Sequence, residues 1–127
     1  ICLKLGAGAV VGTDIDPLCM EAARDNMELN HLAAEHADFY LGNLIDDKDL
    51  QQKVGENYDI VVANILADIV IPLTPVAAGH IKKGGIYITS GIIDFKEEAV
   101  VQAVVEAGFE ILEVCHQGEW VSVTARK

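Results

Sequence analysis

Short apolar runs rich in β-branched residues alternate with amphipathic stretches along the chain, and this alternation restricts its fold more than any other feature. Parallel strands need a crossover connection, usually a helix, so repeated strand–helix pairs predict an α/β fold with a mainly parallel sheet. The predicted strands are residues 9–14, 38–41, 58–63, 86–90, 109–115 and 120–125. The predicted helices are residues 16–30, 46–53, 67–79 and 95–107.

Local signals define several of these elements. Asp16 followed by Pro17 predicts a helix start, because Asp favours the N-cap and Pro the first helical position. Residues 9–13 and 58–63 are apolar enough for two buried strands, the second covered on both faces. Residues 82–85 predict a turn. The last two strands follow each other without a helix, which predicts a hairpin-like pair at the end of the sheet.

The formal charge of −11 argues against direct binding to a nucleic-acid backbone, which needs a basic surface. It suits a basic protein partner attracted by opposite charge, and it is equally compatible with a purely solubilising role. No apolar run approaches the roughly 18 to 20 residues of a membrane span. The cysteines, Cys2, Cys19 and Cys115, have no C-x-x-C spacing and the histidines form no metal pattern, so we expect no metal site and a reduced, cytoplasmic setting.

Polar residues at the ends of the predicted strands are the candidate site residues, because ligands of open α/β sheets bind at the carboxyl ends of strands. This rule selects Asp14, Asn43, Asn64 and Ser90-Gly91. A carboxylate at the end of the first strand can accept hydrogen bonds from both hydroxyls of a ribose. Alternatively, Asp14 and Asp16 together cap the next helix. Asp16 is better placed for that cap, so we predict that Asp14 binds a ribose.

Two asparagines leave alternatives open. Asn64 follows a predicted strand, and it either caps the next helix or holds a polar ligand group with its side-chain carbonyl. Asn43 either contacts the edge of a purine or is a turn residue that tolerates the left-handed conformation. The glycines of residues 6–12 follow a helix end and precede a strand, which is the reverse of a phosphate-binding loop, so they are interpreted as turn residues.

Several motifs resemble those of class I S-adenosylmethionine-dependent methyltransferases. Residues 11–17 and 21–26 are similar to the second conserved block of these enzymes, and residues 61–67 are similar to their fourth-strand block. The motifs typical of the ribosomal protein L11 methyltransferase family are Asn64-Ile65-Leu66-Ala67, Ser90-Gly91-Ile92-Ile93 and Glu119-Trp120-Val121. Together these motifs cover nearly the whole chain.

The resemblance implies a Rossmann-like, seven-stranded sheet, mostly parallel with an antiparallel last strand. Residues 1–127 would form a partial S-adenosylmethionine-dependent methyltransferase domain, with S-adenosyl-L-methionine as cofactor. The resemblance places Asn64 beside the methyl donor and the incoming amine, as the catalytic residue. The implied substrates are lysine side chains and the N-terminal amine of a ribosomal protein. The implied cofactor-binding residues are Asp14, Ile15, Asn43 and Asn64.

The sequence also departs from the family pattern. It lacks the first strand, the glycine-rich loop and the substrate-grasping domain, so it is interpreted as part of a longer protein. In the family, the missing strand lies between the strands that end at Asp14 and at Ala63, so two strand edges would lack partners, which is costly. We therefore expect residues 1–127 alone to be inactive, with a sheet that is rearranged or completed by another molecule.

Two other functions share part of this pattern. A nicotinamide-dinucleotide oxidoreductase also has an acidic residue after the corresponding strand, but the Asn64-Ile65-Leu66-Ala67 turn and the terminal strand pair argue against it. A non-catalytic interaction domain would keep the fold and fail to bind S-adenosylmethionine. Methyl transfer is the function that the sequence predicts.

Overall fold

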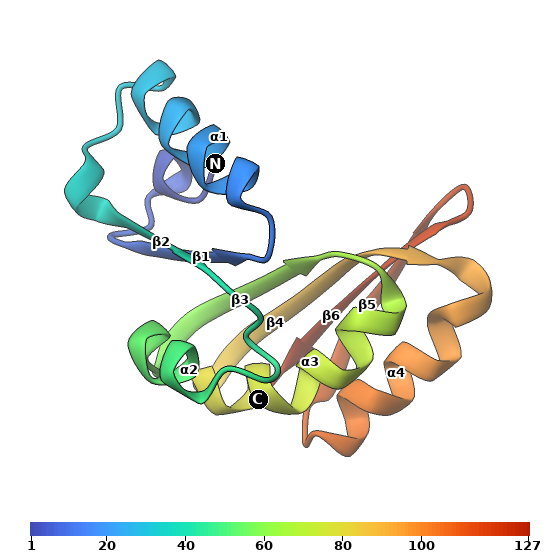
Figure 1. The fold of residues 1–127 in the computed structure, drawn as a ribbon. Helices are drawn as coiled ribbons and strands as arrows, with labels where there is room; N and C mark the ends of the chain where they lie inside the picture. The colour runs from blue at the N-terminus through green and yellow to red at the C-terminus, as the bar shows by residue number, and fades with distance from the viewer. The chain divides into compact units, whose positions relative to one another are not determined.

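The computed structural model describes residues 1–127 (Figure 1). The chain forms two compact units, Ile1–Val54 and Gly55–Lys127, which we call the N-terminal unit and the C-terminal unit. Strands alternate with helices through most of both units, so the predicted α/β class is confirmed. That residues 1–127 act together as one domain stays a prediction.

The N-terminal unit contains a two-stranded parallel sheet packed against one longer helix. Its elements are η1 (Leu3–Leu5, a 3-10 helix), β1 (Val10–Asp14), α1 (Pro17–Leu29), η2 (Ala34–His36), β2 (Ala37–Leu41) and α2 (Lys48–Val54). Strands β1 and β2 are paired as far as Asp14, which lies opposite Leu41. Helix α1 begins as predicted, because Asp16 is its N-cap and accepts a hydrogen bond from the Leu18 N–H at 2.9 Å.

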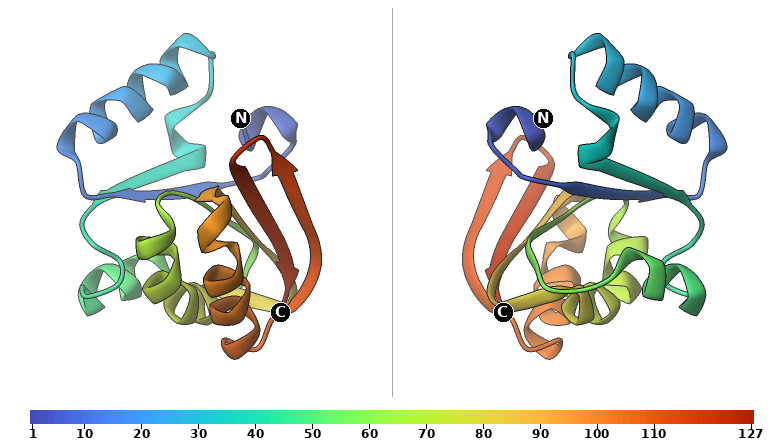
Figure 2. Two further views of the ribbon diagram at one scale, coloured as in Figure 1. Left: turned by 90° about the vertical axis from the view of Figure 1, so that its right-hand side faces the viewer. Right: turned by 90° about the vertical axis from the view of Figure 1, so that its left-hand side faces the viewer.

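The C-terminal unit contains a four-stranded sheet with two helices. Its elements are β3 (Tyr58–Asn64), α3 (Ala67–His80), β4 (Ile81–Ile93), η3 (Asp94–Lys96), α4 (Glu97–Glu106), β5 (Glu110–Gln117) and β6 (Trp120–Arg126). The strand order is β3-β4-β6-β5; β3 and β4 are parallel, and β6 is antiparallel to both of its neighbours. The predicted antiparallel last strand is therefore confirmed. Helices α3 and α4 lie side by side on one face of this sheet (Figure 2).

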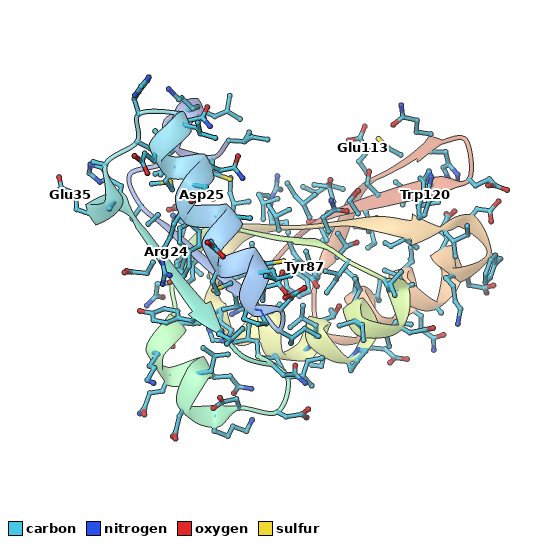
Figure 3. All side chains as sticks on the ribbon, turned by 45° about the horizontal axis from the view of Figure 1, so that its top comes forward. Arg24, Asp25, Glu35, Tyr87, Glu113 and Trp120 are labelled. Carbon is cyan, nitrogen blue, oxygen red and sulfur yellow. The ribbon has the colours of Figure 1, made fainter.

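The core of the C-terminal unit lies between its sheet and these two helices. Tyr87 of β4, labelled in Figure 3, is fully buried there. Its ring stacks on that of Phe109, with ring centroids 5.3 Å apart. The Tyr87 hydroxyl lies 3.3 Å from Thr74 Oγ1 of α3, and either group can donate the hydrogen bond. Burial raises the pKa of Tyr87, so its hydroxyl is protonated at neutral pH. Apolar packing and a buried hydroxyl pair thus fix α3 on the sheet.

The segment predicted as a turn, residues 82–85, is instead a bulge within β4. Tyr58 of β3 pairs with Ile81 of β4, and Ile60 pairs with Ile86. The four residues 82–85 of β4 therefore lie opposite the single residue Asp59 of β3. Gly84 has a φ of 79°, a left-handed conformation that glycine adopts without strain. Lys82 forms an ion pair with Asp59 across the bulge, and this contact lowers the pKa of the Asp59 carboxyl. The turn prediction was wrong because the glycines bend the strand without ending it.

Two strands that were predicted to be buried are partly exposed. All residues of β1 are only half-buried, and Ile60 and Val62 of β3 are 56% and 55% exposed. Both strands lie at the edge of their sheets, with one side unpaired. In the C-terminal unit both helices cover the face of Val61 and Ala63, so Ile60 and Val62, which alternate with these residues, face away from the helices.

Thr89 of β4 is fully buried, yet its Oγ1 has no hydrogen-bond partner. An unsatisfied buried hydroxyl costs about 1–3 kcal/mol. We therefore expect Thr89→Val, which keeps the shape of the side chain, to raise the free energy of unfolding by about 1–2 kcal/mol. Urea unfolding measures this difference, with Thr124→Val at a half-buried position of β6 as the control. A lower free energy of unfolding for Thr89→Val would show that the hydroxyl has a stabilising partner.

Candidate functional site

Asp14 is the last residue of β1, at the carboxyl edge of the N-terminal sheet. Its half-buried carboxylate takes part in the turn that leads into α1, because Oδ1 accepts a hydrogen bond from the Asp16 N–H at 2.9 Å. This carboxylate also raises the pKa of the neighbouring Cys19 thiol. A carboxylate has about four lone-pair positions. The bond from Asp16 therefore leaves acceptor positions for at least two more hydrogen bonds.

The two alternatives for Asp14 are thus compatible. Asp16 provides the N-cap of α1, as predicted, and Asp14 supports the same turn through the Asp16 N–H. The turn holds the Asp14 carboxylate in a fixed place at the strand end. Ile15 follows directly in the chain, and its apolar side chain is 74% exposed.

Asn43 lies in the loop after β2, and both ends of its amide are bonded within that loop. Oδ1 accepts a hydrogen bond from the Ile45 N–H at 3.1 Å, and Nδ2 donates to Asp46 Oδ2 at 2.8 Å. These bonds favour the role of a turn residue, although Asn43 is not in the left-handed conformation that this alternative named. A direct contact of Asn43 with a purine stays a prediction.

Asn64 is the last residue of β3, at the carboxyl edge of the C-terminal sheet, where it lies opposite Ser90 of β4. Its side chain is exposed and makes no hydrogen bond within the chain. Helix α3 has Leu66 as its N-cap residue and no side-chain cap bond. The alternative in which Asn64 caps α3 is therefore wrong, and the amide is free to bind a ligand.

The candidate residues thus form two groups. Asp14, Ile15 and Asn43 belong to the carboxyl edge of the N-terminal unit, and Asn64 and Ser90 belong to that of the C-terminal unit. Ile15 and Asn64 are accessible and unbonded through their side chains, whereas the amide of Asn43 is committed to its loop.

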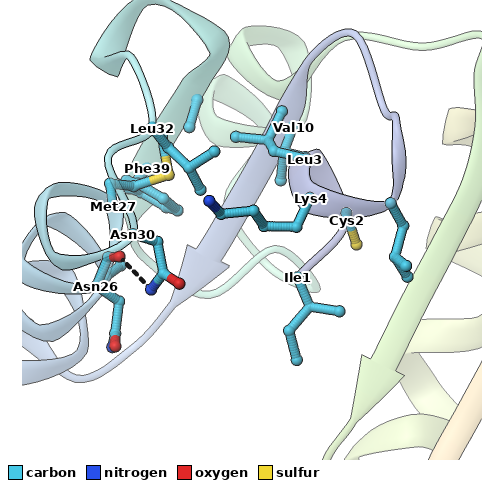
Figure 4. A pocket seen from close by; sticks show the side chains of 13 residues that line it. Ile1, Cys2, Leu3, Lys4, Val10, Asn26, Met27, Asn30, Leu32 and Phe39 are labelled. Atoms are coloured by element: carbon cyan, nitrogen blue, oxygen red, sulfur yellow. Dashed lines mark hydrogen bonds between the residues drawn. The ribbon is translucent and has the colours of Figure 1, made fainter.

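A cavity of about 540 Å³ in the N-terminal unit contains none of these residues (Figure 4). It is lined mainly by apolar side chains, among them Met27 of α1 and Phe39 of β2. Val10 and Ala37, the first residues of β1 and β2, also line it, so the cavity reaches the end of the strands opposite to Asp14. We assign it no part in the candidate site.

Other kinds of site are not found in the chain. No group of three or more His, Cys, Asp or Glu side chains is arranged to hold a metal ion. The three cysteines are free and exposed. None of the helices combines the length and the apolar character needed to cross a membrane.

Comparison with known proteins decides the family. The family model described as Ribosomal protein L11 methyltransferase (PrmA) matches residues 1–127, the entire chain. The chain belongs to this family. The resemblance to ribosomal protein L11 methyltransferases inferred from the sequence motifs is therefore confirmed.

Individual members of the family are similar over nearly the whole chain. The ribosomal protein L11 methyltransferases of Agathobacter rectalis and Lachnospira eligens are 59% and 45% identical to it, each over 100% of this chain. These alignments cover 40% and 41% of the relatives, so the chain spans about two fifths of their length. The crystal structure of the ribosomal protein L11 methylase from Lactobacillus delbrueckii subsp. bulgaricus superposes with a TM-score of 0.85 at 33% identity, covering 98% of this chain and 61% of that chain.

The same fold occurs in more distant proteins. Aeropyrum pernix fibrillarin, solved with natively bound S-adenosyl-L-methionine, superposes with a TM-score of 0.72 at 15% identity, covering 92% of this chain and 55% of that chain. The predicted class I methyltransferase fold is confirmed by these superpositions.

Proposed function

We propose that the full-length protein transfers a methyl group from S-adenosyl-L-methionine to amine groups of ribosomal protein L11, on lysine side chains and at the N-terminus. The observation that carries this proposal is the match of the family model to the entire chain. The relatives from Agathobacter rectalis and Lachnospira eligens are named ribosomal protein L11 methyltransferases, which supports the same substrate.

In this proposal, Asp14 binds the ribose of the cofactor. Its carboxylate is held by the turn to Asp16 and has acceptor positions left for about two hydroxyl donors. A ribose offers two adjacent hydroxyls, which matches this capacity. The exposed Ile15 side chain next to the carboxylate offers an apolar surface for the nucleoside. Asn43 would reach a purine only by exchanging its bond to Asp46.

Asn64 is proposed to position the amine that receives the methyl group. When bound, S-adenosylmethionine supplies a methyl group that is already activated for displacement. The task of the protein is then alignment, which can lower the barrier by about 7–11 kcal/mol. The side-chain carbonyl of Asn64 can accept a hydrogen bond from the amine and so orient its lone pair. An amide is not a strong base, so water removes the proton.

The amine must be neutral to attack. An unperturbed lysine has a pKa near 10.4, whereas an α-amine has one of about 7.7–8.0. Because a larger fraction of the α-amine is neutral at pH 7, methylation of lysine depends more strongly on removal of a proton before attack. The free, exposed amide of Asn64 suits either acceptor.

The proposed partner is a basic ribosomal protein in the cytoplasm. The formal charge of −11 attracts a basic protein and disfavours direct contact with nucleic acid. The three free, exposed cysteines fit a reducing compartment.

The unpaired edges of β1 and β3 are expected to change the association and the cofactor binding of a polypeptide that consists of residues 1–127 alone. Exposed strand edges pair readily with other chains, so we expect this polypeptide to associate through its edges and to bind S-adenosylmethionine more weakly than the full-length protein. Sedimentation measures the association state of residues 1–127 and of the full-length protein, and a titration with S-adenosylmethionine measures the Kd of each. A monomer with full-length affinity would contradict it.

The proposed function is tested by incubating the full-length protein with ribosomal protein L11 and S-adenosylmethionine labelled in the methyl group. Label in N-methylated amines of the ribosomal protein supports the proposal. Hydride transfer with a nicotinamide dinucleotide, in the absence of methyl transfer, would instead support the oxidoreductase alternative. Failure to bind S-adenosylmethionine would support the non-catalytic interaction domain.

A further inference from the structure

Gly91 of β4 lies so close to Asn64 that a Cβ atom on it would displace the end of the Asn64 side chain. Gly91 directly follows Ser90, which pairs with Asn64 of β3. On the other side of β4, the pairing with β6 shifts register between Thr89 and Ile92. A Cβ atom on Gly91 would lie 2.9 Å from Asn64 Oδ1 and 3.3 Å from the carbonyl oxygen of Ile65. The φ of Gly91 is 76°, in the left-handed region that favours glycine.

No hydrogen bond fixes the direction of the Asn64 amide. Its side chain is exposed and has no partner within the chain, so the rotamers open to it are those that neighbouring atoms do not block. The bare Cα of Gly91 leaves the space into which the carbonyl end of this amide points. A methyl group at this place would overlap Oδ1 and force the side chain into another rotamer.

We propose that Gly91 is a positioning residue: because it has no Cβ, it leaves open the rotamer in which the Asn64 carbonyl points towards β4, and this is the rotamer that orients the acceptor amine. The inference rests on the proposed function, because it acts through the role of Asn64. Gly91 itself contacts neither the cofactor nor the amine in this proposal. Its effect is expected in the rate of methyl transfer, because a small misplacement of an aligning group can cost a large factor in rate.

The chain offers a matched control in the same strand. Gly84 of β4 has a φ of 79°, close to that of Gly91, but a Cβ atom there would meet nothing within 4 Å. Gly84→Ala and Gly91→Ala therefore impose the same backbone strain, and only the second displaces Asn64. Gly91→Asn is a second test variant, because Asn tolerates the left-handed region better than Ala does.

The experiment compares kcat, KM and thermal unfolding of the full-length protein with those of Gly84→Ala, Gly91→Ala and Gly91→Asn. We expect both Gly91 variants to lower kcat about 10-fold with little change in KM for S-adenosylmethionine. Gly84→Ala is expected to lose similar stability and to keep its kcat. Equal kcat values for the folded Gly91 variants and Gly84→Ala would overturn the inference.

A double variant separates this inference from the proposed function. In an Asn64→Ala background, Gly91→Ala is expected to change kcat less than about 2-fold, because the side chain it displaces is absent. An undiminished effect of Gly91→Ala in that background would overturn the positioning role alone. Unchanged kcat in Asn64→Ala by itself would overturn the proposed role of Asn64, and the inference with it.

Discussion

Replacing Asp14 by Ala in the full-length protein is expected to weaken S-adenosylmethionine binding about 100-fold. Each hydrogen bond to a charged group contributes about 1.5–3 kcal/mol, so the loss of two bonds to ribose hydroxyls amounts to about 3 kcal/mol or more. Isothermal titration calorimetry measures the change in Kd. The carboxylate is well placed for this role because the hydrogen bond from the Asp16 N–H fixes it without using all of its acceptor capacity.

Asp16→Ala is the matched control for this variant. Asp14→Ala also removes the bond from the Asp16 N–H, so part of its effect could come from a disturbed turn. Asp16→Ala disturbs the same turn by removing the N-cap of α1, at a cost of about 1 kcal/mol in stability, but leaves the Asp14 carboxylate in place. Similar losses of affinity in both variants would show that the turn, and not the carboxylate, is what the cofactor needs.

Replacing Asn64 by Ala is expected to lower turnover by about 10-fold or more, with the fold intact. The side chain is exposed and makes no hydrogen bond in the chain, so its removal leaves no buried group unsatisfied and the free energy of unfolding should change little. Steady-state kinetics with S-adenosylmethionine and ribosomal protein L11 measure kcat, and chemical unfolding measures stability.

The control for Asn64→Ala is Asn26→Ala, at an exposed position of α1 to which we assign no role in binding or catalysis. It makes the same chemical change and should keep full turnover. If Asn64→Ala turns over as fast as Asn26→Ala, the residue has no part in the mechanism. A loss of folding in Asn64→Ala would contradict the structural argument that its side chain is free.

Features set by neighbouring residues were predictable from the sequence. The Asp16-Pro17 helix start depends on hydrogen bonds between residues two apart, so a local pattern was sufficient. The positions of Asp14 and Asn64 at strand ends followed from the apolar runs that precede them. The hairpin-like pair of the last two strands also followed from their adjacency, and the family motifs agreed with it by implying an antiparallel last strand.

Features set by distant residues were not predictable. The exposure of Ile60 and Val62 depends on which face of the sheet the helices cover, and their apolar character does not determine this. The cap predicted as one alternative for Asn64 failed because α3 begins after Leu66, two residues further along. The closeness of Gly91 to Asn64 arises from strand pairing, so the sequence marked Gly91 only as a residue at a strand end.

The ribose-binding role of Asp14 is tested most directly by changing the ligand and the protein together. The Kd values of the full-length protein and of Asp14→Ala are measured for S-adenosylhomocysteine and for its analogue without the ribose 2′-hydroxyl. If Asp14 binds that hydroxyl, the unaltered protein binds the analogue about 10-fold more weakly, whereas Asp14→Ala binds both ligands equally. An Asp14→Ala variant that still discriminates between the two ligands by the same factor would contradict the assignment.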